Sequence, residues 1–390
     1  MDYSWDSDLE TFLAEVRAFC AEYATEELRE ELRTGTGGEG GGSGPLAKKI
    51  HNELEKRGWP RIAWPIEYGG KGKSPWYQYA MVQEFSYHGI PFGGLSVGSV
   101  APALMNFGTE DQKKKYLPGI LDGEMTFAIG YSEPNAGTDL ASLQTRAVRD
   151  GDEYVVNGQK IWTSGAHVST HVWLAARTDP DAPKHRGVSM FIVPLDTDGM
   201  TVRPLFTMAG VRTNEVFFED VRIPADSLVG DENRGWYIVA NALDFERISL
   251  APTGALARQW ERTIEWLGEH RPEKLQDSQT RSQLADLKVD LHLLRALNGV
   301  NGDIIANGRT PTMEASMAKV WSSELRYRLS SASMDLIGRA GALRISSGEF
   351  AANDGQNEQT FRSSPILRFG GGTNEVQRSI IAQRGLGLPR

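Results

Sequence analysis

One segment, residues 127–164, constrains the fold of this chain more than any other. It opens with the turn-rich run SEPNAGT, residues 132–138, whose small and hydroxyl side chains leave backbone N–H groups free to meet an anionic or polar ligand. It closes on the run KIWTS, in which Trp162 is a large aromatic residue that could pack over a flat cofactor. The segment therefore predicts a ligand-facing loop attached to a β domain.

Two dipeptides inside this segment are typical hairpin signals. Asp150-Gly151 and Asn157-Gly158 both favour the positive-φ turns that join antiparallel strands. The residues between them, 153–156, have the composition of a strand. We therefore expect a turn at each dipeptide with one strand between the two turns.

The rest of the chain alternates between helical and strand-like patterns. Apolar residues recur every three or four positions over 8–33, which predicts one helix, and helical patterns return at 46–57 and from 76 to about 121. Residues 126–235 instead show β-branched runs separated by Gly, Asp and Pro. From Trp236 onward helices are expected again, with a bundle-type stripe of Leu284, Leu287, Leu291 and Leu294.

Composition narrows the functional classes. At 390 residues the chain is long for one domain, and the order helical, β, helical predicts domains at 1–125, 126–235 and 236–390. The net charge of −9 argues against nucleic-acid binding, and the single cysteine, Cys20, excludes an intrachain disulfide. No apolar run reaches ~18 residues and no signal-peptide pattern is present, so we expect a cytoplasmic protein without a membrane span.

Two short patterns suggest sites that the sequence context does not support. Gly35, Gly37 and Gly40 formally match a dinucleotide-binding fingerprint, but a charged helix precedes them where a strand is required, so we interpret them as a linker. His167 and His171 are four apart, which suits a metal only on a helix, and they fall in a predicted β region. No metal is expected.

Residues 127–164 closely resemble the middle domain of the acyl-CoA dehydrogenase family. The family pattern of Ser/Thr-Glu-Pro-x-Ala-Gly-Ser/Thr-Asp followed by Gly-Asp-x-Tyr-x-x-Asn-Gly-x-Lys-x-Trp is matched almost residue for residue. The resemblance extends from about residue 8 to the C-terminus. It implies an α+β fold with an N-terminal helical domain, a middle β-barrel and a C-terminal four-helix bundle.

The resemblance also implies a cofactor and a reaction. The cofactor is FAD, and the reaction is the α,β-dehydrogenation of an acyl-CoA thioester to the trans-2-enoyl-CoA. Matching positions assign the flavin to Ile129, Tyr131, Ser132, Gly137, Thr138, Trp162, Ser164, Thr373 and Glu375. They assign substrate contacts to Thr138, Asp244, Arg247 and Gly371.

The catalytic base is expected at Glu246. The reaction needs a carboxylate to remove the α-proton, and many family members carry a glutamate two residues before the threonine that matches Thr373. Here that position is Gly371. A second branch of the family keeps its base on a helix of the C-terminal bundle, in a motif that resembles residues 243–248, LDFERI, and Glu246 falls on the base position. In a largely apolar cleft the pKa of such a carboxyl rises toward the value a general base needs.

The expected substrate and partners depend on a resemblance to one group within this family. The run FGGGTNEVQR, Glu246 and the terminal GLGLPR look most like bacterial acyl-CoA dehydrogenases of sterol side-chain breakdown, which implies a bulky or branched acyl group, with a straight-chain acyl-CoA as the alternative. An electron-transfer flavoprotein is the expected acceptor. An acyl-CoA oxidase, a flavin-dependent monooxygenase and a non-catalytic partner subunit remain alternatives on the same fold.

The expected assembly is a tetramer. In the family a neighbouring subunit holds the FAD diphosphate and adenine with an Arg-x-x-Phe-Gly segment and a Gln-x-x-Gly-Gly-x-Gly turn. Here residues 270–277 lack Phe-Gly, Asp335 replaces the glutamine and Arg339 replaces a glycine. An aspartate would repel a diphosphate, and Arg339 or Arg271 could compensate for that charge. Both a homotetramer and an α2β2 heterotetramer with a paralogous chain stay open.

Overall fold

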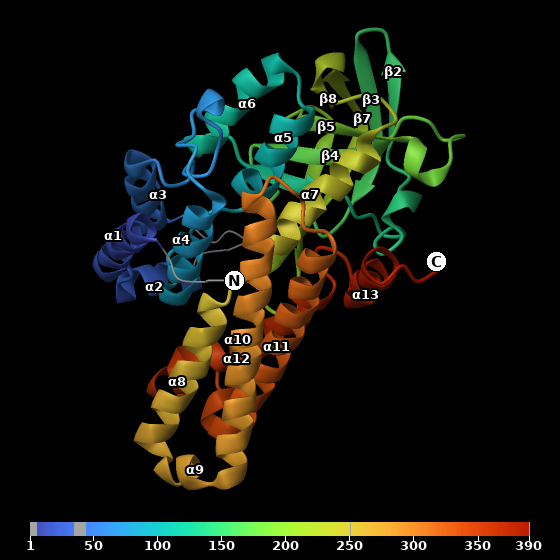
Figure 1. The fold of residues 1–390 in the computed structure, drawn as a ribbon. Helices are drawn as coiled ribbons and strands as arrows, with labels where there is room; N and C mark the ends of the chain where they lie inside the picture. The colour runs from blue at the N-terminus through green and yellow to red at the C-terminus, as the bar shows by residue number, and fades with distance from the viewer. Residues whose placement is uncertain (1–5, 35–43, 250, 390) are drawn as a thin grey trace. The chain divides into compact units, whose positions relative to one another are not determined.

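The computed structural model describes residues 6–34, 44–249 and 251–389, with the backbone alone for 33–34 and 244–249. Gly35, Gly37 and Gly40 lie outside the described residues. The chain divides into two compact units, which we call the bundle unit (residues up to Thr25, Ser74–Ile90 and from Arg247) and the sheet unit (Glu26–Lys73 and Pro91–Glu246). Figure 1 shows the elements of both.

The bundle unit is built from helices. Its α-helices are α1 (Ser7–Tyr23), α4 (Pro75–His88), α8 (Gly254–His270), α9 (Pro272–Gln276), α10 (Ser278–Ala306), α11 (Met313–Ile337), α12 (Gln356–Ser363) and α13 (Asn374–Ile380). Short 3₁₀ or π segments follow α11, α12 and α13. They are η6 (Gly338–Ala342), η7 (Ile345–Phe350) and η8 (Ala352–Gly355) after α11, η9 (Ser364–Arg368) after α12 and η10 (Ile381–Gly385) after α13. The predicted leucine stripe lies on α10, and all four leucines are buried.

The sheet unit combines a mixed sheet with helices. The helices are α2 (Glu26–Thr34), α3 (Pro45–Arg57), α5 (Ala101–Phe107), α6 (Glu110–Leu121) and α7 (Gly235–Ser249), with short η1 (Ile66–Tyr68), η2 (Ser96–Val100), η3 (Leu140–Ser142), η4 (Lys184–Arg186) and η5 (Ala225–Ser227). The strands are β1 (Phe127–Gly130), β2 (Arg146–Asp150), β3 (Glu153–Lys160), β4 (His171–Arg177), β5 (Val188–Pro194), β6 (Met200–Phe206), β7 (Arg212–Pro224) and β8 (Leu228–Val229).

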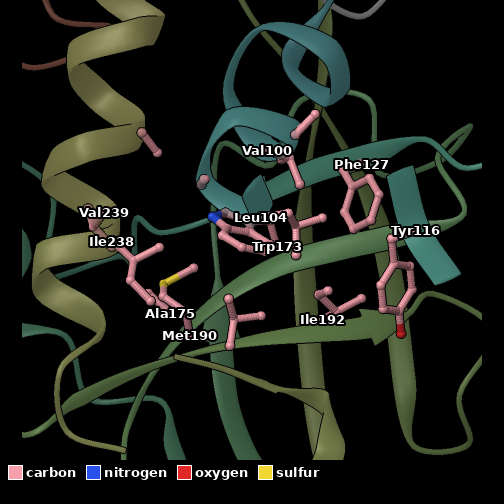
Figure 2. Close-up of a cluster of buried hydrophobic side chains, with 14 of the residues drawn as sticks. Val100, Leu104, Tyr116, Phe127, Trp173, Ala175, Met190, Ile192, Ile238 and Val239 are labelled. Carbon is pink, nitrogen blue, oxygen red and sulfur yellow. The ribbon is translucent and has the colours of Figure 1, made fainter. Parts of the chain in front are cut away.

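The eight strands form one sheet that is buried on both faces at its centre. The strand order is β6-β7-β3-β2-β4-β5-β8, and β1 pairs with β4 in parallel. Along β4, Trp173 belongs to one core cluster, whereas Val172 and Leu174 belong to another, as the two-residue period of a strand requires. Figure 2 shows Trp173 on the sheet with Leu104 of α5 and Ile238 of α7 in the same cluster.

Two sequence predictions were wrong in detail. The single helix expected over 8–33 is two helices, because Ala24 leaves the helical region with ψ 58° and the compact units meet in sequence at Thr25 and Glu26. Asn157-Gly158 is not a hairpin turn but lies within β3, at a register shift against β7. Gly158 has φ 149°, and a Cβ there would lie 2.7 Å from the Cα of Thr145, so glycine permits a bulge beside a neighbouring backbone. Asp150-Gly151 does join β2 to β3.

None of the helices in the described part of the chain is both long enough and apolar enough to cross a membrane.

Candidate functional site

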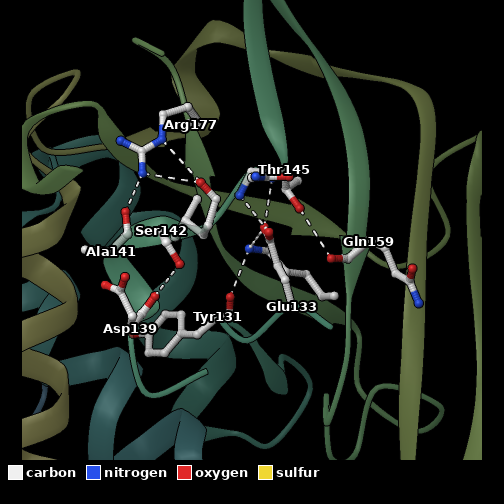
Figure 3. Close-up of polar contacts among 11 residues, drawn as sticks. Tyr131, Glu133, Asp139, Ala141, Ser142, Thr145, Gln159 and Arg177 are labelled. Atoms are coloured by element: carbon white, nitrogen blue, oxygen red, sulfur yellow. Dashed lines mark hydrogen bonds and ion pairs between the residues drawn. The ribbon is translucent and has the colours of Figure 1, made fainter. Parts of the chain in front are cut away.

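A buried ion pair fixes the loop that follows β1. The Nζ of Lys160, at the end of β3, lies 2.8 Å from Glu133 Oε1 and also donates to the carbonyl oxygen of Tyr131 at 3.0 Å. The backbone N–H groups of Gln144 and Thr145 donate to the two carboxylate oxygens of Glu133 at 2.6 and 2.8 Å (Figure 3). The carboxylate of Glu133 thus joins the start of the loop to its end at Gln144 and Thr145 and to Lys160 of β3.

The charges of this pair are set by burial and by mutual attraction. Burial lowers the pKa of Lys160 to about 8, against the opposing attraction of Glu133. Burial alone would raise the pKa of Glu133, but the charge and hydrogen bond of Lys160 and the backbone donors hold it below its ordinary value. Both groups are therefore charged at neutral pH.

Trp162 is exposed and strained. It lies just after β3 with φ 61°, a conformation that costs a non-glycine residue about 1–3 kcal/mol, and its side chain is 56% exposed. The loop around it is held by Asn214, which accepts from Thr163 N at 3.0 Å through its carbonyl and donates to Thr163 O at 2.9 Å through Nδ2. Ser164 Oγ contacts Thr213 Oγ1 at 3.3 Å. The hydrogen bonds of Thr163 and Ser164 thus fix the loop, and the aromatic ring of Trp162 is exposed on the surface of the unit.

The other sheet-unit positions predicted to face the flavin differ in accessibility. Gly137 and Thr138 are exposed and Ser132 is partly exposed, so their backbone and hydroxyl groups can reach a ligand. Tyr131 is buried, and its hydroxyl accepts from Trp173 Nε1 at 3.0 Å. Ile129 packs against the core cluster beside Trp173. The tyrosine and isoleucine side chains therefore support the loop from within the core.

On the bundle unit, a buried lysine holds the glycine-rich turn before α13. Lys319 Nζ, on α11, donates to the carbonyl oxygens of Arg368 and Gly372 at 3.2 and 2.7 Å and to Asn374 Oδ1 at 2.9 Å. Gln377 Nε2 donates to the carbonyl oxygen of Gly371 at 3.1 Å. Gly372 has φ 94°, and a Cβ there would lie 2.6 Å from Gln377 Nε2, so the turn requires glycine.

Thr373 ends this turn as the N-cap of α13. Its hydroxyl accepts from Val376 N at 3.2 Å and so satisfies one N–H group of the first turn. Glu375 is exposed, and hydrogen bonds at the helix start, from its own backbone and from Thr373, hold its pKa below the ordinary value. A negative charge is favourable at this helix end.

The predicted base lies on α7. The backbone of Asp244, Glu246 and Arg247 is helical, and their side chains lie outside the described residues. A helical backbone places residues 244 and 246 about 200° apart around the axis, on different sides of α7.

The two regions matched to the family's neighbour-binding segments lie close together. A Cβ on Gly338 would lie 3.7 Å from Arg271 Nη1, so the corner between α8 and α9 meets the turn after α11. Asp335 and Arg339 are both exposed beside this turn.

The histidines that could suggest a metal site, His167 and His171, lie at a cavity. His167 and His171 line a cavity of about 760 Å³ on the sheet unit with Asp196 and Arg212. His171 opens strand β4, and His167 lies in the turn before it. Over the described ranges there is no group of three or more His, Cys, Asp or Glu side chains that could hold a metal ion.

Comparison with known proteins places this geometry in a family. Models of the acyl-CoA dehydrogenase N-terminal, middle and C-terminal domains match residues 6–124, 128–221 and 233–386. The acyl-CoA dehydrogenase FadE26 of Mycobacterium tuberculosis is 40% identical over 100% of this chain and 99% of its own length. FadE29 of the same organism is 36% identical over 97% of this chain and 96% of its own length. The chain belongs to the acyl-CoA dehydrogenase family.

Solved structures agree with this assignment. The structure titled Tcur3481-Tcur3483 steroid ACAD has a TM-score of 0.91 at 40% identity and covers 100% of both chains. The ChsE4-ChsE5 complex from Mycobacterium tuberculosis has a TM-score of 0.90 at 38% identity, again covering 100% of both chains. The predicted family, the α+β fold class and the assignment to an enzyme of this family are confirmed.

Sequence reasoning missed three buried side chains that shape the candidate site. Glu133 and Lys160 lie within the segment that carries the resemblance, but their pairing depends on strand β3 passing behind the loop. Lys319 lies 53 positions before the turn residue Gly372 that it holds. The sequence does contain a feature that could have pointed to Lys319: it is a lysine in the otherwise small and apolar stretch ASMAKVW of α11.

Proposed function

We propose that this chain catalyses the FAD-dependent α,β-dehydrogenation of an acyl-CoA thioester with a bulky, steroid side-chain-like acyl group. The observation that carries the proposal is Trp162. An exposed aromatic ring on a backbone with φ 61° is a cost to the folded protein unless a ligand uses the ring. Family membership supplies the ligand class, because acyl-CoA dehydrogenases are flavoproteins.

The residues present fit an isoalloxazine ring. Trp162 offers a flat apolar face, and Ser132, Thr138 and Ser164 offer accessible hydroxyl or backbone groups beside it. FAD, when bound, supplies the acceptor for the hydride that leaves the substrate β-carbon. The chain's own contribution is to orient the ring, since the ion pair of Glu133 and Lys160 fixes the segment behind it.

The α-proton is proposed to go to Glu246. The position of residue 246 near the end of α7 and the glycine at 371, where a glutamate stands in many relatives, support this assignment. Asp244 and Arg247 are proposed to contact the substrate arm, and Gly371 to leave room beside the thioester. Thr373 and Glu375, at the start of α13, are proposed to lie near the flavin.

A steroid-type acyl group and a two-chain assembly are supported by the relatives. The solved structures with 40% and 38% identity are titled a steroid ACAD and a complex of two differently named chains. We propose an α2β2 tetramer in which a paralogous chain supplies the half-site that residues 270–277, Asp335 and Arg339 no longer match. An electron-transfer flavoprotein is the proposed acceptor.

Anaerobic titration of the flavin-loaded protein with a panel of acyl-CoAs tests the function. We expect steroid side-chain acyl-CoAs to bleach the visible flavin absorbance faster than straight-chain acyl-CoAs of equal carbon number. Bleaching by straight chains alone would overturn the substrate class. Absence of bleaching by any acyl-CoA in a loaded protein would overturn the dehydrogenase itself, and reoxidation by air within seconds would indicate an oxidase.

A further inference from the structure

A cavity of about 610 Å³ lies in the bundle unit between α1, α4 and α10. Sites that hold drug-sized molecules have volumes of roughly 300–1,000 Å³. Among the residues that the structure describes, none of those proposed to contact the flavin or the acyl-CoA lines this cavity. We call this space, which Trp76, Tyr79 and Arg295 line with others, the α4 cavity.

The α4 cavity has aromatic residues on one side and small residues on another. The rings of Trp76 and Tyr79, on α4, meet edge to face with their centroids 5.5 Å apart. The residues of α10 include Ala296 and Gly299, and a glycine in a helix interior is unfavourable relative to alanine. The small residues of α10 thus leave room beside two large rings, which suits a flat apolar molecule.

Contacts along α4 show which residues lie at each end of the cavity. A Cβ on Gly302 would lie 2.8 Å from Trp76 Cη2, so Asp303, the next residue of α10, lies near the start of α4. Tyr79 is one turn further along α4, and the charge of Arg295 acts on its hydroxyl group. The two helices are therefore antiparallel, with Asp303 at one end of the α4 cavity and Arg295 at the other.

The end of the α4 cavity at Arg295 is basic. Arg17 and Glu84 also line it, but they form an ion pair with each other, with Arg17 Nη2 2.8 Å from Glu84 Oε1. His292 lies one turn before Arg295 on α10. No acidic side chain that the structure describes forms an ion pair with Arg295. Its guanidinium group is therefore available to a carboxylate, which it can bind through two parallel hydrogen bonds.

The opposite end is acidic. Asp6 lies there because α1 runs parallel to α4, as the contact of Phe12 with Tyr77 shows, and Asp6 precedes Phe12 by more than one turn. The carboxylate of Asp6 caps α1 by accepting from Leu9 N at 2.8 Å. Asp303 forms no ion pair with a basic side chain in the described part of the chain. Its carboxylate is therefore available to accept a hydrogen bond from a hydroxyl group.

We propose that the α4 cavity binds a fused-ring carboxylic acid with a hydroxyl group at the end remote from its carboxylate. The carboxylate binds Arg295, the rings lie against Trp76 and Tyr79, and the hydroxyl donates to Asp303. Arg295 and Asp303 are eight positions apart on α10, about 12 Å of helix rise, so the ligand is elongated. Fused rings fill the space beside two aromatic side chains better than a single alkyl chain does. This binding does not depend on the proposed dehydrogenation.

Isothermal titration calorimetry of the flavin-loaded protein, without acyl-CoA, tests this ligand class. Three probes are used below the concentrations at which they form micelles. Cholate is a fused-ring hydroxy acid, methyl cholate lacks its charge, and dodecanoate lacks its rings. We expect cholate to bind at least about tenfold more tightly than either of the other two. Binding of methyl cholate or of dodecanoate as tight as that of cholate would overturn the proposal.

Two variants of α10 test where cholate binds. Arg295→Met removes the charge that receives the carboxylate and should weaken cholate binding at least about tenfold without weakening methyl cholate. Ala296→Phe places a ring in the α4 cavity and should abolish cholate binding. Arg281→Met and Ala285→Phe, at exposed positions of the same helix, are the matched controls and should bind cholate as wild type does. Melting temperatures check that all four variants fold, and unchanged cholate affinity in either cavity variant would contradict this site.

A second subunit is the other candidate occupant of an open cavity on α10. The titration is therefore repeated at protein concentrations where light scattering shows the assembled protein. Cholate binding that persists on assembly supports the proposal, whereas binding that is lost on assembly would show that another subunit fills the α4 cavity. Flavin bleaching by acyl-CoA is recorded in a separate experiment, so failure of this site and failure of the dehydrogenase are distinguished.

Discussion

Lys319 Nζ lies 2.7 Å from the carbonyl oxygen of Gly372, 53 positions later in the chain. The lysine is 2% exposed, and its other acceptors are the carbonyl oxygen of Arg368 and Asn374 Oδ1. Backbone oxygens thus solvate a charge that water does not reach. The ammonium group of Lys319, on α11, therefore fixes the conformation of the glycine-rich turn.

Replacing Lys319 with Met should destabilise the protein. Three oxygens lose their donor, and we expect the free energy of unfolding to fall by about 3–5 kcal/mol. Urea unfolding measures the loss, and hydrogen exchange at residues 370–376 should show earlier opening of this turn than of α10. Lys114→Met, at an exposed lysine of α6, is the control and should change stability by less than about 0.5 kcal/mol. A similarly small effect at Lys319 would contradict this account.

The sequence predicts those structural features that depend on neighbouring residues, and it misses those that depend on contacts between distant segments. The Asp150-Gly151 hairpin and the leucine stripe of α10 follow from neighbouring residues, and the structure has both. The Asn157-Gly158 signal failed because pairing with β7 extends β3 through it, a contact 60 residues away in the case of Gly158 and Phe218. The contacts of Glu133 with Lys160 and of Lys319 with Gly372 both depend on packing between segments that are distant in the sequence.

The ion pair of Glu133 and Lys160 should give stability an unusual pH dependence. The pKa of Glu133 is lowered in the fold, so its stabilisation is present above the ordinary value of 4.5 and is lost as pH falls through the folded pKa. The pKa of Lys160 falls from 10.5 to about 8, so between these values the unfolded chain binds more protons and the contribution of Lys160 to stability rises with pH.

The reference for this measurement is the double variant Glu133→Gln/Lys160→Met, which removes both charges. The stability of wild type relative to the double variant should decrease below pH 4.5 and increase between pH 8 and 10.5. Glu133→Gln alone should cost about 3–5 kcal/mol at pH 7, since it leaves a buried ammonium group unpaired. A flat difference across both windows would show that the fold shifts neither pKa and would contradict this account.

Trp162→Gly should separate stability from flavin binding. Glycine removes the cost of the positive φ at a position whose ring is 56% exposed, so we expect unfolding free energy of the flavin-free protein to stay equal or rise by up to about 1 kcal/mol. Flavin affinity should fall, and Trp162→Phe, which keeps an aromatic face, should retain binding with an altered visible spectrum and fluorescence. Unchanged affinity and spectra in both variants would show that the ring does not contact flavin.

Glu246→Gln tests the proposed base. The change is nearly isosteric, so FAD loading should persist while the rate of flavin reduction by the best acyl-CoA falls by about 10²–10⁴. Stopped-flow absorbance under anaerobic conditions gives that rate, and Glu219→Gln, at an exposed glutamate of β7, serves as the matched control. Near wild-type reduction in Glu246→Gln would place the base elsewhere.

The last prediction concerns the half-site around Arg271, Asp335 and Arg339. The carboxylate of Asp335 is exposed beside a turn that a neighbour's diphosphate would have to approach, and like charges repel there. We therefore expect the protein purified alone to carry fewer than one FAD per chain, and co-expression with a paralogous chain to restore both loading and activity.

Asp335→Gln/Arg339→Gly restores the family pattern and should raise flavin loading of the chain on its own, whereas Asp286→Gln on α10 should not. Absorbance ratios and light scattering give the loading and the mass. A yellow, active tetramer of this chain alone with one FAD per chain would contradict the heteromer and establish that Arg271 and Arg339 compensate for the aspartate.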